Sequence, residues 1–272
     1  MNFYEILENL ICESDPEQKL YRFRMFYRQY KNGDIRREDC SEIISFTKPS
    51  YHTFCQIVKP QKVPKRKNIA KKEGQVLLLH AVAHIEYSAI DLALDHLYRF
   101  RTLPDEYYDD WMQVALDEVR HFEMISGLMK ELDAAYGDIE VHNALFEASV
   151  WTQNSFLERM AVVPRYLEAN GLDATPHILE KLSRVPQTAM SEKIQSLLST
   201  ILEEEVSHVQ YGDKWFDYAC KKENVDKSVF FEIIQKYYPQ AYPRKRYINV
   251  PARKEAGFSC NELNQMTIDP VC

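Results

Sequence analysis

The sequence predicts an all-α protein whose core is a four-helix bundle, with helical extensions before and after it. The 272 residues include 45% hydrophobic residues but only 7 glycines, so the chain offers an ordinary core and little turn material. Apolar residues recur at helical spacing along four long segments, separated by stretches that contain Gly or Pro. The expected bundle helices are 74–101, 105–135, a helix within 140–169, and 188–221.

These helices divide the chain into three parts. We expect an N-terminal helical extension with a basic strap at 1–73, the bundle at 74–221, and a C-terminal extension packed on the bundle at 222–272. No apolar run approaches the roughly 18 residues of a membrane span. The first residues lack the basic region and apolar core of a signal peptide. A cytoplasmic protein without a membrane partner is therefore expected.

The six cysteines form no C-x-x-C pair, which argues against a cysteine metal site or a redox motif. We expect them to be reduced thiols. They are Cys12, Cys40, Cys55, Cys220, Cys260 and Cys272.

Residues 59–72 form a basic segment in a chain whose net charge is −7. The overall charge argues against a general nucleic-acid-binding surface, although not against a local basic patch. Pro60 and Pro64 exclude a continuous helix here, and no acidic residue occurs before Glu73. We interpret the segment as a solvated, extended strap. The functional alternative is a contact with phosphate or RNA.

The stretch 111–122 carries the main functional signal. As a helix it places Glu118 and His121, three residues apart, on its apolar face. Burying a carboxylate and an imidazole without partners costs several kcal/mol, and a metal ion is one way to avoid that cost. Glu205 and His208 repeat the same pattern on the apolar face of the fourth helix.

Each of the other two long helices carries one glutamate on its apolar face, Glu86 in the first and Glu158 in the third. Glu86 and Glu118 lie at similar distances from the turn near Leu103, so an antiparallel hairpin places them at one level. One Glu-x-x-His pair is weak evidence, but this joint pattern matches the six-ligand set of ferritin-like di-iron and di-manganese carboxylate bundles. The predicted metal ligands are Glu86, Glu118, His121, Glu158, Glu205 and His208.

The ligand set suits two iron ions, with manganese or a mixed Mn/Fe pair as the alternative. Divalent iron binds carboxylate oxygen and imidazole, and four carboxylates balance the charge of two divalent ions. Such a centre binds O₂ and leaves an oxidant for a substrate. The structural alternative is a metal-free hydrogen-bond network of buried Glu and His.

A second polar row on the first bundle helix has heptad-like spacing and contains His80, His84, Asp91 and Asp95. We interpret it as a polar face on which histidine pairs with aspartate. Metal ligation by the two histidines is the alternative.

Six stretches carry a resemblance to a known family. They are LHAVAHIE at 79–86, DEVRHF at 117–122, LERMAV at 157–162, LEANGLDATP at 167–176, EVSHV at 205–209 and NVPARKEAGF at 249–258. They resemble an uncharacterised ferritin-like family of bacterial proteins, over most of the chain. More distantly, the ligand pattern is similar to that of the di-iron hydroxylase that oxidises a hypermodified adenosine in tRNA.

The third helix raises a question of topology. Ferritin-like bundles connect their second and third helices by a crossover, which makes those helices parallel. Residues 139–150 have a helical pattern, which leaves little chain for a crossover. Either this helix is absent or the topology departs from the family. Pro164 should kink the third helix or mark an irregularity, and Gly171 should end it.

The expected function is that of a non-haem di-iron oxidoreductase, which uses O₂ to oxidise or hydroxylate an organic substrate. The basic 59–72 segment and the arginines near 244–253 favour a phosphate-bearing substrate, with tRNA as one candidate. An electron donor and a homodimer are further expected partners. No catalytic residue beyond the ligands and no organic cofactor site is predicted.

Two other functions remain open. One is a ferroxidase or an iron- or manganese-handling protein, although the large extensions suit a storage shell poorly. The other is a metal-stabilised scaffold without turnover.

Overall fold

The computed structural model describes residues 2–38, 42–244 and 247–272, and these residues form an all-α protein without a β-strand. The chain divides into two compact units, Met1–Val150 and Trp151–Cys272. The first holds α1 (Phe3–Cys12), α2 (Pro16–Lys31), η1 (Ser50–Thr53), η2 (Pro60–Lys62), α3 (Lys72–Arg99), α4 (Asp105–Glu131) and most of α5 (Ala144–Trp151). The second holds α6 (Phe156–Val162), η3 (Val163–Glu168), α7 (Ala169–Ser183), α8 (Ala189–Glu223), α9 (Val229–Tyr237), α10 (Val250–Glu255) and α11 (Cys260–Met266). The expected division into three parts stays a prediction.

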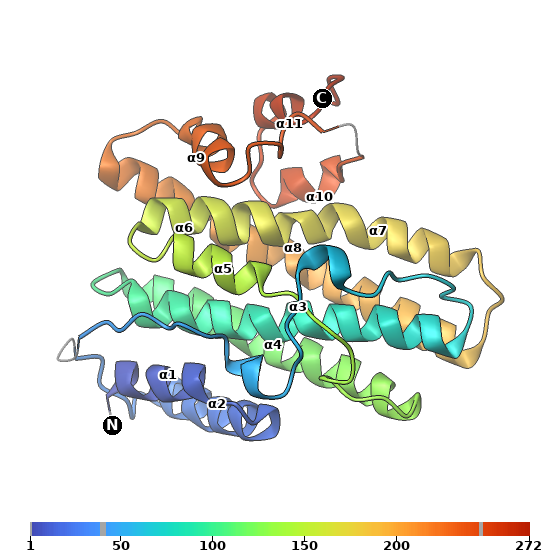
Figure 1. The fold of residues 1–272 in the computed structure, drawn as a ribbon. Helices are drawn as coiled ribbons and strands as arrows, with labels where there is room; N and C mark the ends of the chain where they lie inside the picture. Colours follow the sequence, from blue (N-terminus) through green and yellow to red (C-terminus); the bar gives the residue numbers. More distant parts are fainter. Residues whose placement is uncertain (1, 39–41, 245–246) are drawn as a thin grey trace. The chain divides into compact units, whose positions relative to one another are not determined.

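The first unit is built on an antiparallel hairpin of α3 and α4, which lie side by side along their lengths (Figure 1). Both helices confirm the predictions for 74–101 and 105–135. α3 is long and apolar enough to cross a membrane by length and composition, but 72% of its most apolar window is buried within the fold. This burial fits a core helix of a folded protein.

The two N-terminal helices pack against this hairpin, α1 on α3 and α2 on α4. Asp15 caps α2 by accepting from two backbone N–H groups, and Pro16 occupies the first turn. Lys19 of α2 is fully buried and forms an ion pair with Asp91 of α3. The buried ammonium is paired, so it fixes α2 on the hairpin without leaving an isolated charge in the core.

The chain that follows α4 returns along α3. The backbone N–H groups of Gly137 and Ile139 donate to Nε2 of His80, at 3.0 and 3.3 Å. One helical turn further along α3, Nε2 of His84 lies 2.6 Å from the carbonyl oxygen of His142. The segment therefore runs in the direction of α3, opposite to α4. The helix whose presence the sequence left open exists as α5 and follows this returning segment. The chain is therefore long enough for both the helix and a crossover.

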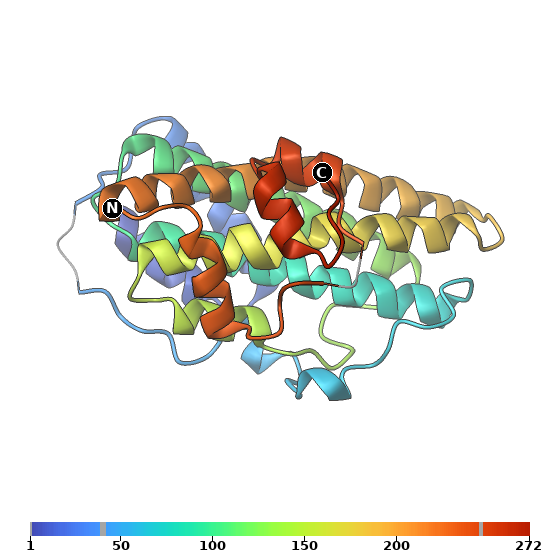
Figure 2. The same ribbon diagram turned by 90° about the horizontal axis from the view of Figure 1, so that it is seen from above.

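The second unit is built on a helical rod, α6, η3 and α7, which packs along α8 (Figure 2). The irregularity predicted at Pro164 is confirmed, because Val163–Glu168 is π-helical. Proline has no N–H and cannot continue the regular α-helical bonding. The prediction that Gly171 ends the helix is wrong, since α7 continues to Ser183. A glycine costs only about 1 kcal/mol within a helix, and packing on α8 outweighs that cost.

Buried ion pairs attach the C-terminal segment to this rod. Arg253 is fully buried and donates to both carboxylate oxygens of Asp173 of α7, at 3.0 and 2.7 Å. Arg165 of η3, also fully buried, donates to Asp213 of α8 and Glu262 of α11, at 2.7 and 2.6 Å. The suggestion that the arginines near 244–253 contact a substrate is therefore wrong for Arg253, whose guanidinium lies in the core.

The expectation that all cysteines are reduced is also wrong for one pair. Cys260 and Cys272 form a disulfide with a Cα–Cα distance of 5.3 Å. Asn264 of α11 accepts hydrogen bonds from the backbone of Val271 and Cys272, which brings the end of the chain back to the helix. A spacing of 12 residues matches no cysteine motif, so the pairing could not be predicted from the spacing. Cys40, Lys245 and Arg246 lie outside the described residues.

Two helical glycines of the second unit should respond in opposite ways to alanine. A Cβ at Gly212 would lie 2.5 Å from Cβ of Pro164, whereas a Cβ at Gly171 would meet nothing within 4 Å. We expect Gly212→Ala to lower the free energy of unfolding by about 1–3 kcal/mol through overpacking. Gly171→Ala should raise it by about 0.5–1 kcal/mol through helix propensity. Urea unfolding followed by circular dichroism measures both, and shifts of the same sign would contradict the packing of η3 on α8.

Candidate metal centre

The α3–α4 hairpin brings three of the predicted ligands together. Glu86, Glu118 and His121 each offer a ligand atom within 4.8 Å of the others. Nδ1 of His121 lies 3.1 Å from a carboxylate oxygen of Glu86 and 3.8 Å from one of Glu118. All three side chains are buried, with exposed fractions of 4%, 1% and 0%. The register explains the meeting, because Glu86 lies 13 residues before the end of α3 and Glu118 lies 13 residues after the start of α4.

Helical periodicity decides which of the neighbouring Asp117 and Glu118 of α4 enters the buried cluster. Val119, Phe122 and Ile125 are buried on the side of the helix that carries Glu118. The preceding Asp117 is instead partly exposed, 3.2 Å from the side-chain amide of Gln113 and 3.5 Å from Arg120. One position along the helix turns the side chain by about 100°, so only Glu118 joins the buried cluster.

The cluster has the charge and the donor atoms of a cation site. Burial lowers the pKa of His121, but hydrogen bonds to Glu118 and Glu86 and the charges of these carboxylates outweigh burial and raise the pKa to about 11. The two carboxylates therefore hold a positive charge between them. A divalent ion can take the place of that proton and bind carboxylate oxygen and imidazole nitrogen, so the residues fit a metal ion.

The second Glu-x-x-His pair has the same local geometry. Both residues lie on α8, where Nδ1 of His208 is 3.7 Å from a carboxylate oxygen of Glu205. His208 is fully buried, whereas the Glu205 side chain is 14% exposed. Their spacing of three residues places both side chains on one face of the helix, as the sequence predicts.

Glu158, the ligand predicted on the third helix, has other partners in the structure. It lies on α6, and its carboxylate accepts hydrogen bonds from Lys236 at 2.6 Å and from the hydroxyl of Tyr237 at 2.5 Å. Both partners belong to α9, and the Glu158 side chain is 23% exposed. Its role as a metal ligand stays a prediction. The sequence pattern missed that two breaks, before α6 and at η3, change which residues of the third helix share a face.

The polar row of α3 is confirmed as a structural face, but the expected His–Asp pairing is wrong. His84 contacts the Tyr136 hydroxyl at 2.9 Å, on the returning chain. Asp91 pairs with Lys19, and Asp95 pairs with Arg99 at 2.8 Å. His84 and Asp91 are about two turns apart, or roughly 10 Å, so each side chain pairs with a nearer group.

The basic 59–72 segment is an exposed strap attached at both ends. The N–H of Val58 donates to the carbonyl of Val141 at 2.8 Å. At the other end, the carbonyl of Asn68 lies so close to Gly74 that a Cβ there would be 2.2 Å away. The exposed cationic side chains of this strap are those of Lys59, Lys62, Lys65, Arg66, Lys67, Lys71 and Lys72.

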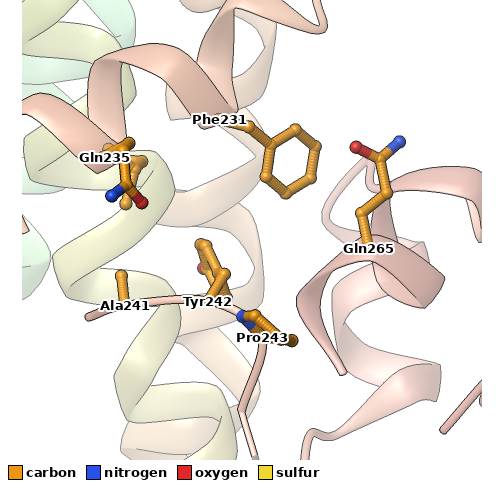
Figure 3. Close-up of a pocket in the computed structure, with 7 residues that line it drawn as sticks. Phe231, Gln235, Ala241, Tyr242, Pro243 and Gln265 are labelled. Atoms are coloured by element: carbon orange, nitrogen blue, oxygen red, sulfur yellow. The ribbon is translucent and has the colours of Figure 1, made fainter. Parts of the chain in front are cut away.

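A cavity in the second unit differs from the buried cluster in its lining. It measures about 250 Å³ and lies between α9, the chain at 241–243, and α11. Figure 3 shows the aromatic ring of Phe231 and the side-chain amides of Gln235 and Gln265 around it. Its lining contains neither a carboxylate nor an imidazole, so it is not suited to the metal chemistry of the buried cluster.

The fold and the cluster define an all-α protein with buried carboxylate and imidazole groups suited to metal binding. Comparison with known proteins gives its family. The chain matches the family described as "Protein of unknown function (DUF455)" over residues 12–264. It is 36% identical over 278 residues to an uncharacterised protein of Haemophilus influenzae, with 96% of this chain and 92% of that protein covered. The chain belongs to the DUF455 family, which confirms the resemblance to an uncharacterised family. No solved structure matches it.

His80 should make the stability of the fold depend on pH. Its Nε2 accepts two backbone N–H groups and must be unprotonated, and burial lowers its pKa from 6.5 to about 4. The folded pKa lies below the unfolded one, so this contribution is complete above pH 6.5 and is lost as the pH falls toward 4. The difference corresponds to about 3 kcal/mol. Urea unfolding at several pH values should show a smaller loss in His80→Gln than in the wild type.

The exposed His177 provides the control for this measurement, because its side chain is 51% exposed. His177→Gln should keep the wild-type dependence on pH. If His80→Gln loses stability between pH 6.5 and 4 as steeply as the wild type, the assignment of a neutral, accepting His80 is wrong.

Proposed function

We propose that the protein is a ferritin-like di-iron carboxylate protein that uses O₂ to oxidise or hydroxylate an organic substrate. The buried cluster of Glu86, Glu118 and His121 carries the proposal, because three ionisable groups converge in a core where each would be costly alone. The proposed ligands are the six that the sequence predicts, with Glu86, Glu118 and His121 on α3 and α4. Glu205 and His208 complete the pair of Glu-x-x-His motifs, and the third helix supplies one carboxylate, predicted from the sequence as Glu158.

The protein residues have distinct tasks in such a centre. The carboxylates balance the charge of the ions, and the two histidines limit the number of negative ligands. Val119, Phe122 and Ile125 keep water from the cluster. Bound iron would supply the electrons for the two-electron reduction of O₂. An electron donor is therefore part of the proposal, and manganese is the alternative metal.

The substrate is proposed to carry phosphate, with tRNA as one candidate. The support is the exposed basic strap at 59–72, whose charge is opposite to the net charge of −7 of the whole chain. Attachment at both ends presents these cations on a defined path, which favours binding to a phosphate chain. The proposed location is the cytoplasm.

Metal analysis tests the proposed centre directly. We expect about two metal ions per chain in the wild type and a loss in Glu118→Ala and His208→Ala, because each substitution removes one ligand of the centre. Inductively coupled plasma mass spectrometry of protein expressed with added iron gives the content.

Glu123→Ala is the matched control, because Glu123 lies on α4 but pairs with Arg24 at the surface. It should keep the wild-type metal content. Full metal content in both ligand variants would contradict the proposed site.

Mixing the diferrous protein with O₂ separates an oxygen-activating centre from an inert scaffold. We expect a transient change in absorbance in a stopped-flow experiment, followed by turnover when a reductant and substrate are present. Size-exclusion chromatography distinguishes the storage alternative, which requires a large cage. An unchanged absorbance on mixing would count against both the oxidase and the ferroxidase functions.

A further inference from the structure

Two carboxylates of the second unit are candidates for the metal ligand opposite Glu205 and His208. One is Glu158 of α6, and the other is Glu168, the last residue of the π-helical turn η3. Both lie on the rod that packs along α8, so the register between the rod and α8 decides between them. The question rests on the proposed function, which requires one carboxylate from the third helix.

Contacts between the rod and α8 fix this register. Pro164 packs on Gly212, and Arg165 donates to Asp213 at 2.7 Å. Eight residues before Pro164, the ring of Phe156 lies 6.5 Å from that of Tyr218. From Phe156 to Pro164 along the rod, the partner on α8 changes from Tyr218 to Gly212, so the two run antiparallel.

Continuing this register places Glu168 at the level of His208. Glu158 falls at the level of Tyr218, ten residues or roughly 15 Å further along α8. The turn between the helices gives the same result. Glu168 lies 15 residues before the end of α7 at Ser183, and Glu205 lies 16 residues after the start of α8.

The surroundings of the two carboxylates agree with the register. Both residues are partly exposed, but the Oε2 atom of Glu168 is buried. Glu158 is 23% exposed and already accepts from Lys236 and Tyr237, so it connects α6 to α9. Using Glu158 as a ligand would require both hydrogen bonds to break and the side chain to cross about three turns of helix.

The π-helical turn explains how Glu168 is held. Arg165 is fully buried in ion pairs with Asp213 and Glu262, and Pro164 is in contact with α8 at Gly212. The turn that ends at Glu168 is therefore fixed to α8 on two sides. Single π-helical turns occur frequently at functional sites, because they redirect side chains within a continuing helix.

We propose that Glu168, and not Glu158, is the carboxylate of the third helix that binds metal together with Glu205 and His208. Glu158 is a structural residue that attaches α9 to α6. In this proposal the π-helical turn, rather than the apolar periodicity of the sequence, determines which glutamate of the third helix is the ligand.

The test compares Glu168→Gln with Glu158→Gln, which remove the same charge with the same change in size. Metal content after expression with iron, and titration of the metal-free proteins with Mn²⁺ followed by electron paramagnetic resonance, are the two measurements. We expect Glu168→Gln to lose at least half of the metal and to bind Mn²⁺ at least tenfold more weakly. Glu158→Gln should keep the wild-type content and affinity.

The outcomes separate the two proposals. Full metal in Glu168→Gln with a loss in Glu158→Gln would overturn this assignment and leave the metal centre intact. A wild-type protein that binds no metal would overturn both. If Glu168→Gln does not fold, Glu168→Asp keeps a carboxylate on a shorter side chain, and it should bind metal more weakly than Glu158→Asp.

Discussion

Buried charge is the constraint on which both units of this structure depend. In the first unit, two carboxylates and one imidazole meet inside the α3–α4 hairpin, where the imidazole nitrogen lies 3.1 Å from Glu86 and 3.8 Å from Glu118. An ion in such a core is tolerated only when opposite charge is close by. The pKa of His121 is raised for this reason, because the two carboxylates stabilise a positive charge between them. The same requirement makes the cluster suited to a metal ion.

The second unit also contains buried charge, which it pairs with arginine. Arg165 and Arg253 are fully buried, and their carboxylate partners come from α7, α8 and α11. Aromatic rings of Phe216, Phe230 and Phe258 lie around Arg165 at 4.4–5.1 Å. These pairs attach the C-terminal segment to the rod and to α8. The residues next to η3 are thereby held in place, which a ligand on that turn requires.

Sequence alone predicted the elements whose residues form uninterrupted helices. The periodicity of apolar residues gave α3, α4 and α8, and counting residues from the turn gave the common level of Glu86 and Glu118. The disulfide between Cys260 and Cys272 and the partners of His80 depend on how distant segments meet. Local spacing carries no information about such contacts, so these features could not be predicted.

The third helix shows the limit of reasoning from periodicity, which succeeded in the α3–α4 hairpin. Periodicity treated 140–169 as one helix, and Glu158 then shared a face with apolar residues on both sides. The chain instead contains α5, a break at 152–155, α6 and the π-helical turn η3. Each break rotates the residues beyond it, so a face defined across them has no structural meaning. Pro164 was visible in the sequence as a sign of irregularity, but its consequence for the register appears only from its contact with Gly212. Contacts between helices, rather than patterns along one of them, are therefore needed to find which residues of the third helix lie level with His208.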